Sequence, residues 1–411
     1  MRHRDNYQLL KKLGSGKFSD VFEAVDCSNN DTNNISITDD DDDGDGDDEV
    51  NGYHSKHVNN RVVIKCLKPV NERKIRREVL VLSHCTRIPN LAKLVGVIWE
   101  DYYSSAKRTS NKNNLHLPPS LILQHAGPNA RWFCHGTGMD AFRNNDATNT
   151  STSTASLNNN NKAHDNDNPS TNNTSMYLTE EEIKYFLYQL LIALNGLHSH
   201  GIIHRDVKPR NVLISRGDND NANNDDTGTT AGMASKSKRS LMLIDLGLAD
   251  FYIPGQRYNV RVASRHYKSP ELLVGYEYYD YGLDMWGVGC ILAGLLLRRE
   301  PFFRGRDNVD QLGKIAAVLG TPDLMEYCDR YSSIPQLSVE LRKAAGCGIT
   351  TERNIYTGRR SWDSLRAPGC PTLSAEGEDL LDRLLVYDHS ERLSAAEAML
   401  HPFFDSVRGS I

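Results

Sequence analysis

The sequence predicts an α+β fold of two lobes, a small β-rich N-terminal lobe and a larger α-helical C-terminal lobe. Residues 7–13 alternate between apolar and polar side chains, as strands do, and residues 62–65 form a second short apolar run that ends in Lys65. Residues 284–297 are mostly apolar and long enough for a helix buried in a core. We place residues 1–126 in the small lobe with its connecting hinge, and residues 127–411 in the large lobe.

Four polar insertions interrupt these lobes, at about residues 28–60, 103–117, 144–175 and 216–240. Each is rich in Asn, Asp, Ser, Thr or Gly and can bury little apolar area, so we expect four disordered loops between core elements. The acidic run within the first insertion starts like a calcium-binding loop, but Val50 stands where that loop would close with Glu. A solvated acidic loop is therefore the expected structure there.

Composition limits the classes of partner. The 411 residues carry a net charge of −5 and a pI near 6.3, without the basic excess that favours nucleic acid. No apolar run reaches membrane-spanning length, and the eight cysteines form no C-x-x-C pair, which favours reduced thiols over zinc or disulfides. We expect a cytoplasmic and nuclear protein, in which the basic stretches 73–77 and 236–239 serve nuclear entry or are only local charge.

The most informative segment is the sequence HRDVKPRN at residues 204–211, followed by DLG at residues 245–247. Phosphoryl transfer needs a group that orients the acceptor hydroxyl, a cation that neutralises the moving phosphate, and oxygen ligands for magnesium. Asp206 and Lys208 supply the first two, and Asn211 and Asp245 supply the ligands. A lone Asp or Lys in a loop is usually solvated surface, but the whole set in this order predicts a phosphotransferase site.

A nucleotide-binding region should then lie upstream. Residues 14–21 read GSGKFSDV, as expected for a glycine-rich hairpin that covers phosphates. Alone this match is weak, because Ser19 replaces the third glycine of the G-x-G-x-x-G pattern. A simple Gly/Ser turn between two strands would give a similar sequence. Lys65 at the end of its strand and Glu78 in the helical stretch 73–82 add the ion pair that holds such a lysine against the α- and β-phosphates.

Over about residues 7–404 the chain resembles the family of casein kinase II catalytic (alpha) subunits, which are acid-directed Ser/Thr protein kinases of the CMGC group. Besides the octapeptide, the resemblance rests on YQLLKKLG at 7–14, YNVRVASR at 258–265, YDYGLDMW at 279–286 and EPFFRG at 300–305. The family itself has Ser at position 19. The resemblance implies a bilobal protein kinase fold in which an ion pair of Glu271 with Arg392 braces the activation segment.

The resemblance also implies the ligands. These are ATP, with GTP as a second nucleotide, and Mg²⁺, and the purine would be read by the backbone of a hinge at residues 124–126. Motif and resemblance together give the nucleotide-binding residues as Leu13, Gly14, Ser15, Gly16, Lys17, Val21, Val63, Lys65, Glu78, Gln124, Ala126, Leu213 and Ile244.

Acidic Ser/Thr protein substrates are the partners that the resemblance implies. Arg261, Arg265 and Lys268 cluster in the activation segment, where cations attract carboxylates or phosphates through charge-assisted hydrogen bonds. Arg77 and Arg210 look like the family's second basic site, and a solvated basic face is the alternative for all five. The regulatory β-subunit is a further implied partner, although the insertion at 103–117 extends the turn that helps to dock it.

Two departures from the family bear on activity. Leu246 replaces the usual Trp between the metal-binding Asp and Gly, so the indole N–H that could lock this turn is absent. Leu123 stands at the gatekeeper position instead of Phe and should deepen the nucleotide pocket. Two other functions stay open: a pseudokinase or scaffold, which the intact catalytic set disfavours, and a proline-directed CMGC kinase, which Arg261 and Lys268 disfavour.

Overall fold

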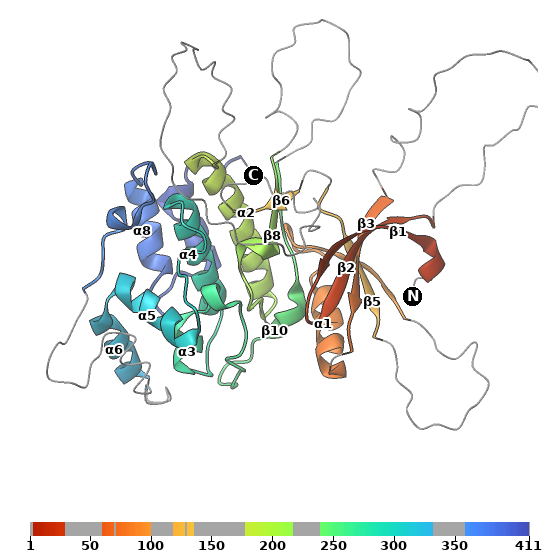
Figure 1. Ribbon diagram of the computed structural model, residues 1–411, viewed down its shortest axis with the longest axis horizontal. Helices are drawn as coiled ribbons and strands as arrows, with labels where there is room; N and C mark the ends of the chain where they lie inside the picture. Colours follow the sequence, from red (N-terminus) through yellow and green to blue (C-terminus); the bar gives the residue numbers. More distant parts are fainter. Residues whose placement is uncertain are drawn as a thin grey trace, which may run out of the picture.

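The computed structural model describes residues 3–28, 60–69, 71–99, 118–127, 130–134, 177–216, 239–331 and 358–410. Strands gather at one end of the molecule and helices at the other, which confirms the predicted bilobal α+β class (Figure 1). Of the four expected loops, 103–117 and 144–175 lie outside the described residues, and 28–60 and 216–240 enter them only at their ends. Among the helices that the structure describes, none combines the length and the apolar character needed to cross a bilayer.

The N-terminal lobe is built on an antiparallel sheet with the strand order β1-β2-β3-β5-β4. Side chains alternate along a strand, so Val62 and Ile64 enter the apolar cluster on one face while Val63 and Lys65 face the other way. The strands predicted over residues 7–13 and 62–65 are both confirmed. The five strands are β1 (Tyr7–Ser15), β2 (Ser19–Asp26), β3 (Arg61–Leu67), β4 (Leu94–Ile98) and β5 (Ser120–Gln124).

Helix α1 (Glu72–His84) lies beside this sheet (Figure 1). The helix begins where the Asn71 side chain accepts a hydrogen bond from the backbone N–H of Arg73, which satisfies one free donor of the first turn. Ile75 and Leu82 are buried against the core, and Glu78 lies between them on the same side. The sequence therefore turns a carboxylate, with its apolar neighbours, toward the strand that carries Lys65.

The C-terminal lobe packs its helices around α4 (Gly282–Leu296), in which every residue is buried, as its apolar sequence predicts. Helix α2 (Glu180–Ser199) begins with a reciprocal capping box between Thr179 and Glu182. The remaining helices are α3 (Pro270–Val274), α5 (Asn308–Leu319), α6 (Thr321–Arg330), α8 (Ala375–Leu384) and α9 (Ala395–Met399). Short strands frame the loops at the lobe boundary: β6 (Arg131–Trp132), β7 (Ile202–Ile203), β8 (Val212–Ser215), β9 (Ser240–Leu243) and β10 (Asp250–Phe251).

One buried carboxylate fixes the loop between β7 and β8 to the core. Asp284, in the first turn of α4, is 1% exposed and accepts hydrogen bonds from the backbone N–H groups of His204 and Arg205, each at 2.8 Å. The loop also approaches α4 closely, since a Cβ on Gly287 would lie 2.7 Å from the carbonyl oxygen of Val207. A loop whose only regular element among the described residues is the short 3-10 helix Pro209–Asn211 thus gains a fixed position.

A buried ion pair holds α3, which follows the activation segment, and the predicted contact of Glu271 with Arg392 is present. The Arg392 guanidinium donates to both oxygens of Glu271, at 2.8 and 2.7 Å, and both side chains are 0% exposed. Burial by itself would raise the pKa of Glu271, but the charge of Arg392 outweighs it and lowers that pKa. Arg392 also donates to the carbonyls of Gly282, Val386 and Tyr387, so one side chain ties three segments together.

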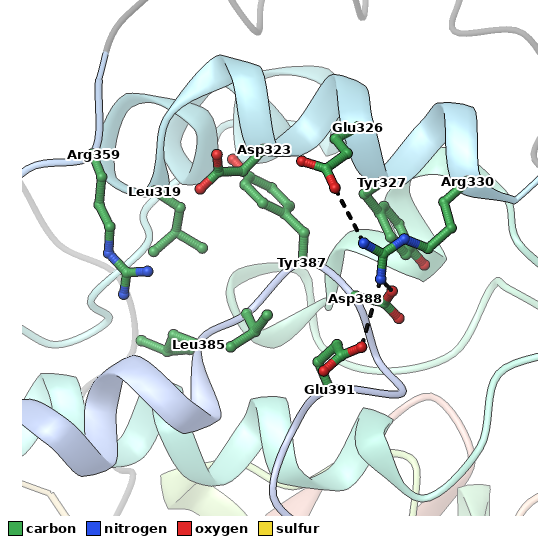
Figure 2. A pocket seen from close by; sticks show the side chains of 11 residues that line it. Leu319, Asp323, Glu326, Tyr327, Arg330, Arg359, Leu385, Tyr387, Asp388 and Glu391 are labelled. Carbon is green, nitrogen blue, oxygen red and sulfur yellow. Dashed lines mark hydrogen bonds and ion pairs between the residues drawn. The ribbon is translucent and has the colours of Figure 1, made fainter.

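The loop that carries Arg392 is held in turn from α6. A cavity of about 350 Å³ lies between α6 and the segment after α8. Figure 2 shows Arg330 at one end of it. Its guanidinium lies 2.7 Å from Asp388, 3.1 Å from Glu326 and 3.5 Å from Glu391. The Tyr331 hydroxyl donates to Asp388 at 2.6 Å. These contacts give the polar lining of this cavity a structural role.

Replacing Arg392 with Leu should lower the free energy of unfolding by about 3–5 kcal/mol, because Glu271 is then buried without its counter-charge. Urea denaturation followed by circular dichroism measures this difference. Arg383→Leu is the control, since its guanidinium is exposed on α8 and bonds only Asp379 among the described residues. Equal midpoints for the two variants would contradict a bracing role for the buried pair.

Candidate active site

The predicted catalytic residues come together around the carboxylate of Asp206, which is 6% exposed. Lys208 Nζ donates to Oδ2 at 2.5 Å, and Asn211 Nδ2 donates to the same oxygen at 3.1 Å. Oδ1 accepts from both the backbone N–H and the hydroxyl of Ser264, each at 3.0 Å. Four donors therefore fix the orientation of this carboxylate.

On the other side of the cleft, Lys65 binds two carboxylates at once. Its Nζ lies 2.7 Å from Glu78 Oε1 and 2.7 Å from Asp245 Oδ1. Burial by itself would lower the pKa of Lys65, but the two carboxylates outweigh it and raise that pKa. The structure thus brings the predicted pair of Lys65 and Glu78 together and adds Asp245 as a third member.

Asp245 occupies a turn with unusual backbone geometry. Its φ of 66° lies in the left-handed region, which is sparsely populated by residues other than Gly and often marks functional sites. The turn is closed by hydrogen bonds from Gly247 N–H to Asp245 Oδ1 and from Ala249 N–H to the Leu246 carbonyl. Leu246 is buried in the main apolar core. The turn is therefore held without the indole that the family usually has there.

Gly247 packs closely against the ion cluster. A Cβ at this position would lie 3.2 Å from Asp245 Oδ1 and 3.4 Å from both Lys65 Nζ and Glu78 Oε2. The charge of Lys65 also lowers the pKa of Asp245 to about 2, although burial by itself would raise it. Asp245 is consequently a carboxylate at any physiological pH.

Asn211 and Asp245 suit a magnesium ion. Asn211 uses its Nδ2 to bind Asp206, which leaves its carbonyl oxygen as a ligand, and Asp245 uses Oδ1 for Lys65, which leaves Oδ2. The Asp245 side chain is 44% exposed, so this oxygen has room for a ligand. Hard oxygen donors of this kind are what Mg²⁺ prefers.

The predicted phosphate-binding residues lie on the β1 to β2 hairpin. Gly14 pairs with Val21 and Ser15 with Asp20, and Gly16 N–H donates to the Ser19 carbonyl at 2.8 Å. Nothing lies within 4 Å of a Cβ built on Gly14, so the space beside this strand is open. Leu13, Val21 and Val63 are half-buried, and Lys17 is exposed at the tip.

The hinge residue Ala126 packs in one small apolar cluster with two residues of the C-terminal lobe, Leu213 and Ile244. A separate cavity of about 420 Å³ touches the hinge, but Lys65 and Ile244 do not line it, so it is not the space beside the Lys65 cluster. Within the described residues, no backbone hydrogen bond uses the N–H or carbonyl of Ala126. This arrangement leaves polar backbone groups beside an apolar surface, as recognition of a purine requires.

Residues 155–404, more than half of the chain, match the protein kinase domain. The chain belongs to the protein kinase family. ATP and Mg²⁺ are the ligands that protein kinases in general use, and the kinase has side chains suited to both.

The three activation-segment cations of the kinase lie on the segment whose Ser264 binds Asp206. Ser264, which binds Asp206, directly precedes Arg265, and both Arg261 and Arg265 are exposed. Lys268 is half-buried and donates to the Val262 carbonyl at 2.8 Å. Burial lowers the pKa of Lys268, although the charge of Asp206 acts against this shift.

The two residues of the predicted second basic site, Arg77 and Arg210, have different surroundings. Arg77 is bound to Asp250 at 2.8 Å, and the same carboxylate binds Arg205 at 2.9 Å, so Arg77 lies beside Arg205. Arg210 instead lies near Tyr267, where burial raises the pKa of the tyrosine and the charge of Arg210 opposes that rise. The structure does not show Arg77 and Arg210 in contact.

Sequence reasoning assigned no role to Ser264 or Asp284. Ser264 both donates to Asp206 and accepts from Lys208 Nζ at 2.8 Å, so it links the two catalytic residues. Its place one residue before Arg265, within the stretch 258–265 that carries the family resemblance, was the available signal. Asp284 lies 79 residues beyond Arg205, and no local pattern joins them.

Ser264→Ala should lower kcat roughly ten- to a hundredfold, since a hydrogen bond to a charged group contributes about 1.5–3 kcal/mol. The KM for ATP should stay unchanged, because the side-chain hydrogen bonds of Ser264 are made with Asp206 and Lys208 and not with the predicted nucleotide-binding residues. Steady-state kinetics with a peptide substrate measures both constants. Ser264→Thr is the matched control and should keep most of the activity, and a fully active Ala variant would contradict the link.

Proposed function

We propose that this kinase phosphorylates Ser or Thr in acidic protein segments, as casein kinase II catalytic subunits do. The observation that carries this proposal is the placement of Arg261, Arg265 and Lys268 on the segment whose Ser264 binds the catalytic carboxylate. Cations at such a position favour a peptide with carboxylates next to the acceptor hydroxyl. The sequence resemblance supports the choice of Ser and Thr as acceptors.

In this function Asp206 orients the acceptor hydroxyl and takes up its proton as the phosphate is transferred. The four donors hold its carboxylate in one orientation. Lys208 lies 2.5 Å from Asp206 and can offset negative charge on the phosphate during transfer. Lys65 holds the nucleotide phosphates while Glu78 orients it. Magnesium, when bound by Asn211 and Asp245, neutralises the phosphate oxygens.

The alternative is a pseudokinase or scaffold whose nucleotide site stabilises the fold without turnover. The contacts around Lys65 and Asp206 argue against it, since every charged group of the phosphoryl-transfer set is present and oriented. Thermal stabilisation by nucleotide without phosphate transfer would favour the scaffold. Use of GTP, docking of a regulatory β-subunit, and a cytoplasmic and nuclear location belong to the casein kinase II-like proposal.

An Asp-rich serine peptide should be phosphorylated with a KM roughly tenfold or more below that of an Arg-rich serine peptide, because opposite charges attract at the activation segment. Arg261→Gln should raise the KM for the acidic peptide roughly five- to tenfold while kcat and the KM for ATP stay unchanged. Radiolabelled phosphate transfer at low salt measures these constants.

Arg257→Gln is the control for local charge, since Arg257 lies four residues earlier and is paired with Glu277. It should leave all constants unchanged. A preference for the basic peptide would overturn the acidic specificity, and equal effects of the two substitutions would show that Arg261 has no particular role.

The KM for the acidic peptide should also rise at alkaline pH. Burial places the pKa of Lys268 below its ordinary 10.5, so the lysine loses its charge at a pH below that value. Lys268→Arg should keep a flat KM over the same range, because Arg stays protonated. Measuring KM from neutral pH to the limit of enzyme stability tests this, and parallel curves for the two proteins would exclude Lys268 as a substrate-binding cation.

A further inference from the structure

A basic pocket lies beside the activation segment, on the side of α5. Its volume is about 510 Å³, and it is lined by Arg265 and His266 from the segment, by Arg304 and Arg306 from the loop before α5, and by Asp310 and Lys314 from α5. Arg304, Arg306 and Lys314 take no part in the contacts of the catalytic carboxylate or of the Lys65 cluster. The nucleotide site and the catalytic loop therefore leave these three cations without a function.

The frame of the pocket is rigid. The Gln311 side chain is 0% exposed, accepts a hydrogen bond from Gly305 N–H at 2.8 Å and donates to the His266 carbonyl at 3.2 Å. A Cβ on Gly305 would lie 2.5 Å from the Gln311 backbone, so only glycine permits this approach. One buried amide thus joins the activation segment, the loop and α5.

The charge of the pocket is strongly positive. Arg265, Arg304, Arg306 and Lys314 face a single carboxylate, that of Asp310, which gives a net charge of +3 with neutral histidine. Among the described residues, the ion pairs of these four cations are limited to one, between Arg306 and Asp310 at 3.3 Å. Three exposed cations keep their hydrogen-bond donors available to a ligand.

We propose that this pocket binds a phosphorylated side chain of the protein substrate, some residues away from the acceptor. Guanidinium groups match phosphate oxygens with paired donors, and a dianionic phosphate offsets more of the +3 charge than one carboxylate does. Arg265 lines this pocket and directly follows Ser264, which binds the catalytic carboxylate. The pocket and the catalytic group are therefore joined by two neighbouring residues of one segment. The inference rests on the proposed function in that it names a second determinant of the same substrates.

Binding of a labelled peptide whose acceptor serine is replaced by Ala tests the pocket without turnover. A series of such peptides carries one phosphoserine at successive positions on either side of the acceptor, and fluorescence anisotropy is measured at about 50 and 150 mM salt. The variant Arg304→Gln/Arg306→Gln/Lys314→Gln should weaken the best phosphopeptide at least about tenfold and leave its unphosphorylated form within about twofold. In turnover with the acceptor restored, KM should rise by a similar factor for the phosphopeptide alone, with kcat unchanged.

The charge-matched control is Arg87→Gln/Arg359→Gln/Arg383→Gln, which removes three exposed cations elsewhere. It should bind every peptide as the unaltered kinase does. Equal weakening by both triple variants, or no weakening by the pocket variant, would overturn the proposal. If the kinase prefers basic acceptor peptides while phosphopeptide binding still depends on the pocket, the proposed acidic specificity is wrong but the proposed phosphate site is supported. If the kinase prefers acidic peptides while phosphopeptide binding does not depend on the pocket, the acidic specificity is supported and the phosphate site is wrong.

Discussion

The arrangement of the two lobes depends on the ion pairs that the ammonium group of Lys65 makes with two carboxylates. This ammonium group binds Glu78 of α1 and Asp245 of the turn after β9, so a single group joins strand, helix and the C-terminal lobe. The cluster of one cation and two carboxylates carries one excess negative charge. Such a cluster favours a further cation, and the free oxygens of Asp245 and Asn211 lie where that cation can be held. Gly247 packs against all three charged groups, so a side chain at this position would press on the Asp245 carboxylate.

Buried charges elsewhere in the kinase position segments more than they stabilise the fold. Removing charges from water costs free energy that their attraction offsets only with good geometry and additional hydrogen bonds. Asp284 meets this condition through two backbone N–H groups and His198, and Arg392 meets it through Glu271 and three carbonyls. The catalytic loop and the activation segment have little regular structure, so these contacts replace the hydrogen-bond ladders that would otherwise fix them.

The sequence could predict those features that depend on local pattern or on motif spacing. The alternation at 7–13, the apolar stretch that became α4, and the pairs of Lys65 with Glu78 and of Glu271 with Arg392 all fall in this class. The roles of Ser264 and Asp284 could not be predicted, because each acts through tertiary contact on residues 56 to 86 positions away. Arg77 shows the same limit, since its partner Asp250 is 173 residues away and no pattern in α1 indicates it.

The attraction of acidic peptides to the proposed substrate sites depends on nearby charges and not on the net charge of the chain. The chain has a net charge of −5, which by itself would repel acidic peptides. At physiological salt the screening length is about 8 Å, so a peptide at the activation segment responds mainly to the cations beside it. Arg265 belongs both to the proposed acceptor-side group and to the basic pocket. Its substitution would weaken both and could not separate them, whereas Arg261 and Arg304 each belong to one. The two sites can therefore be told apart only by substituting residues that they do not share. Because they share Arg265, a ligand bound at one site changes the charge available at the other.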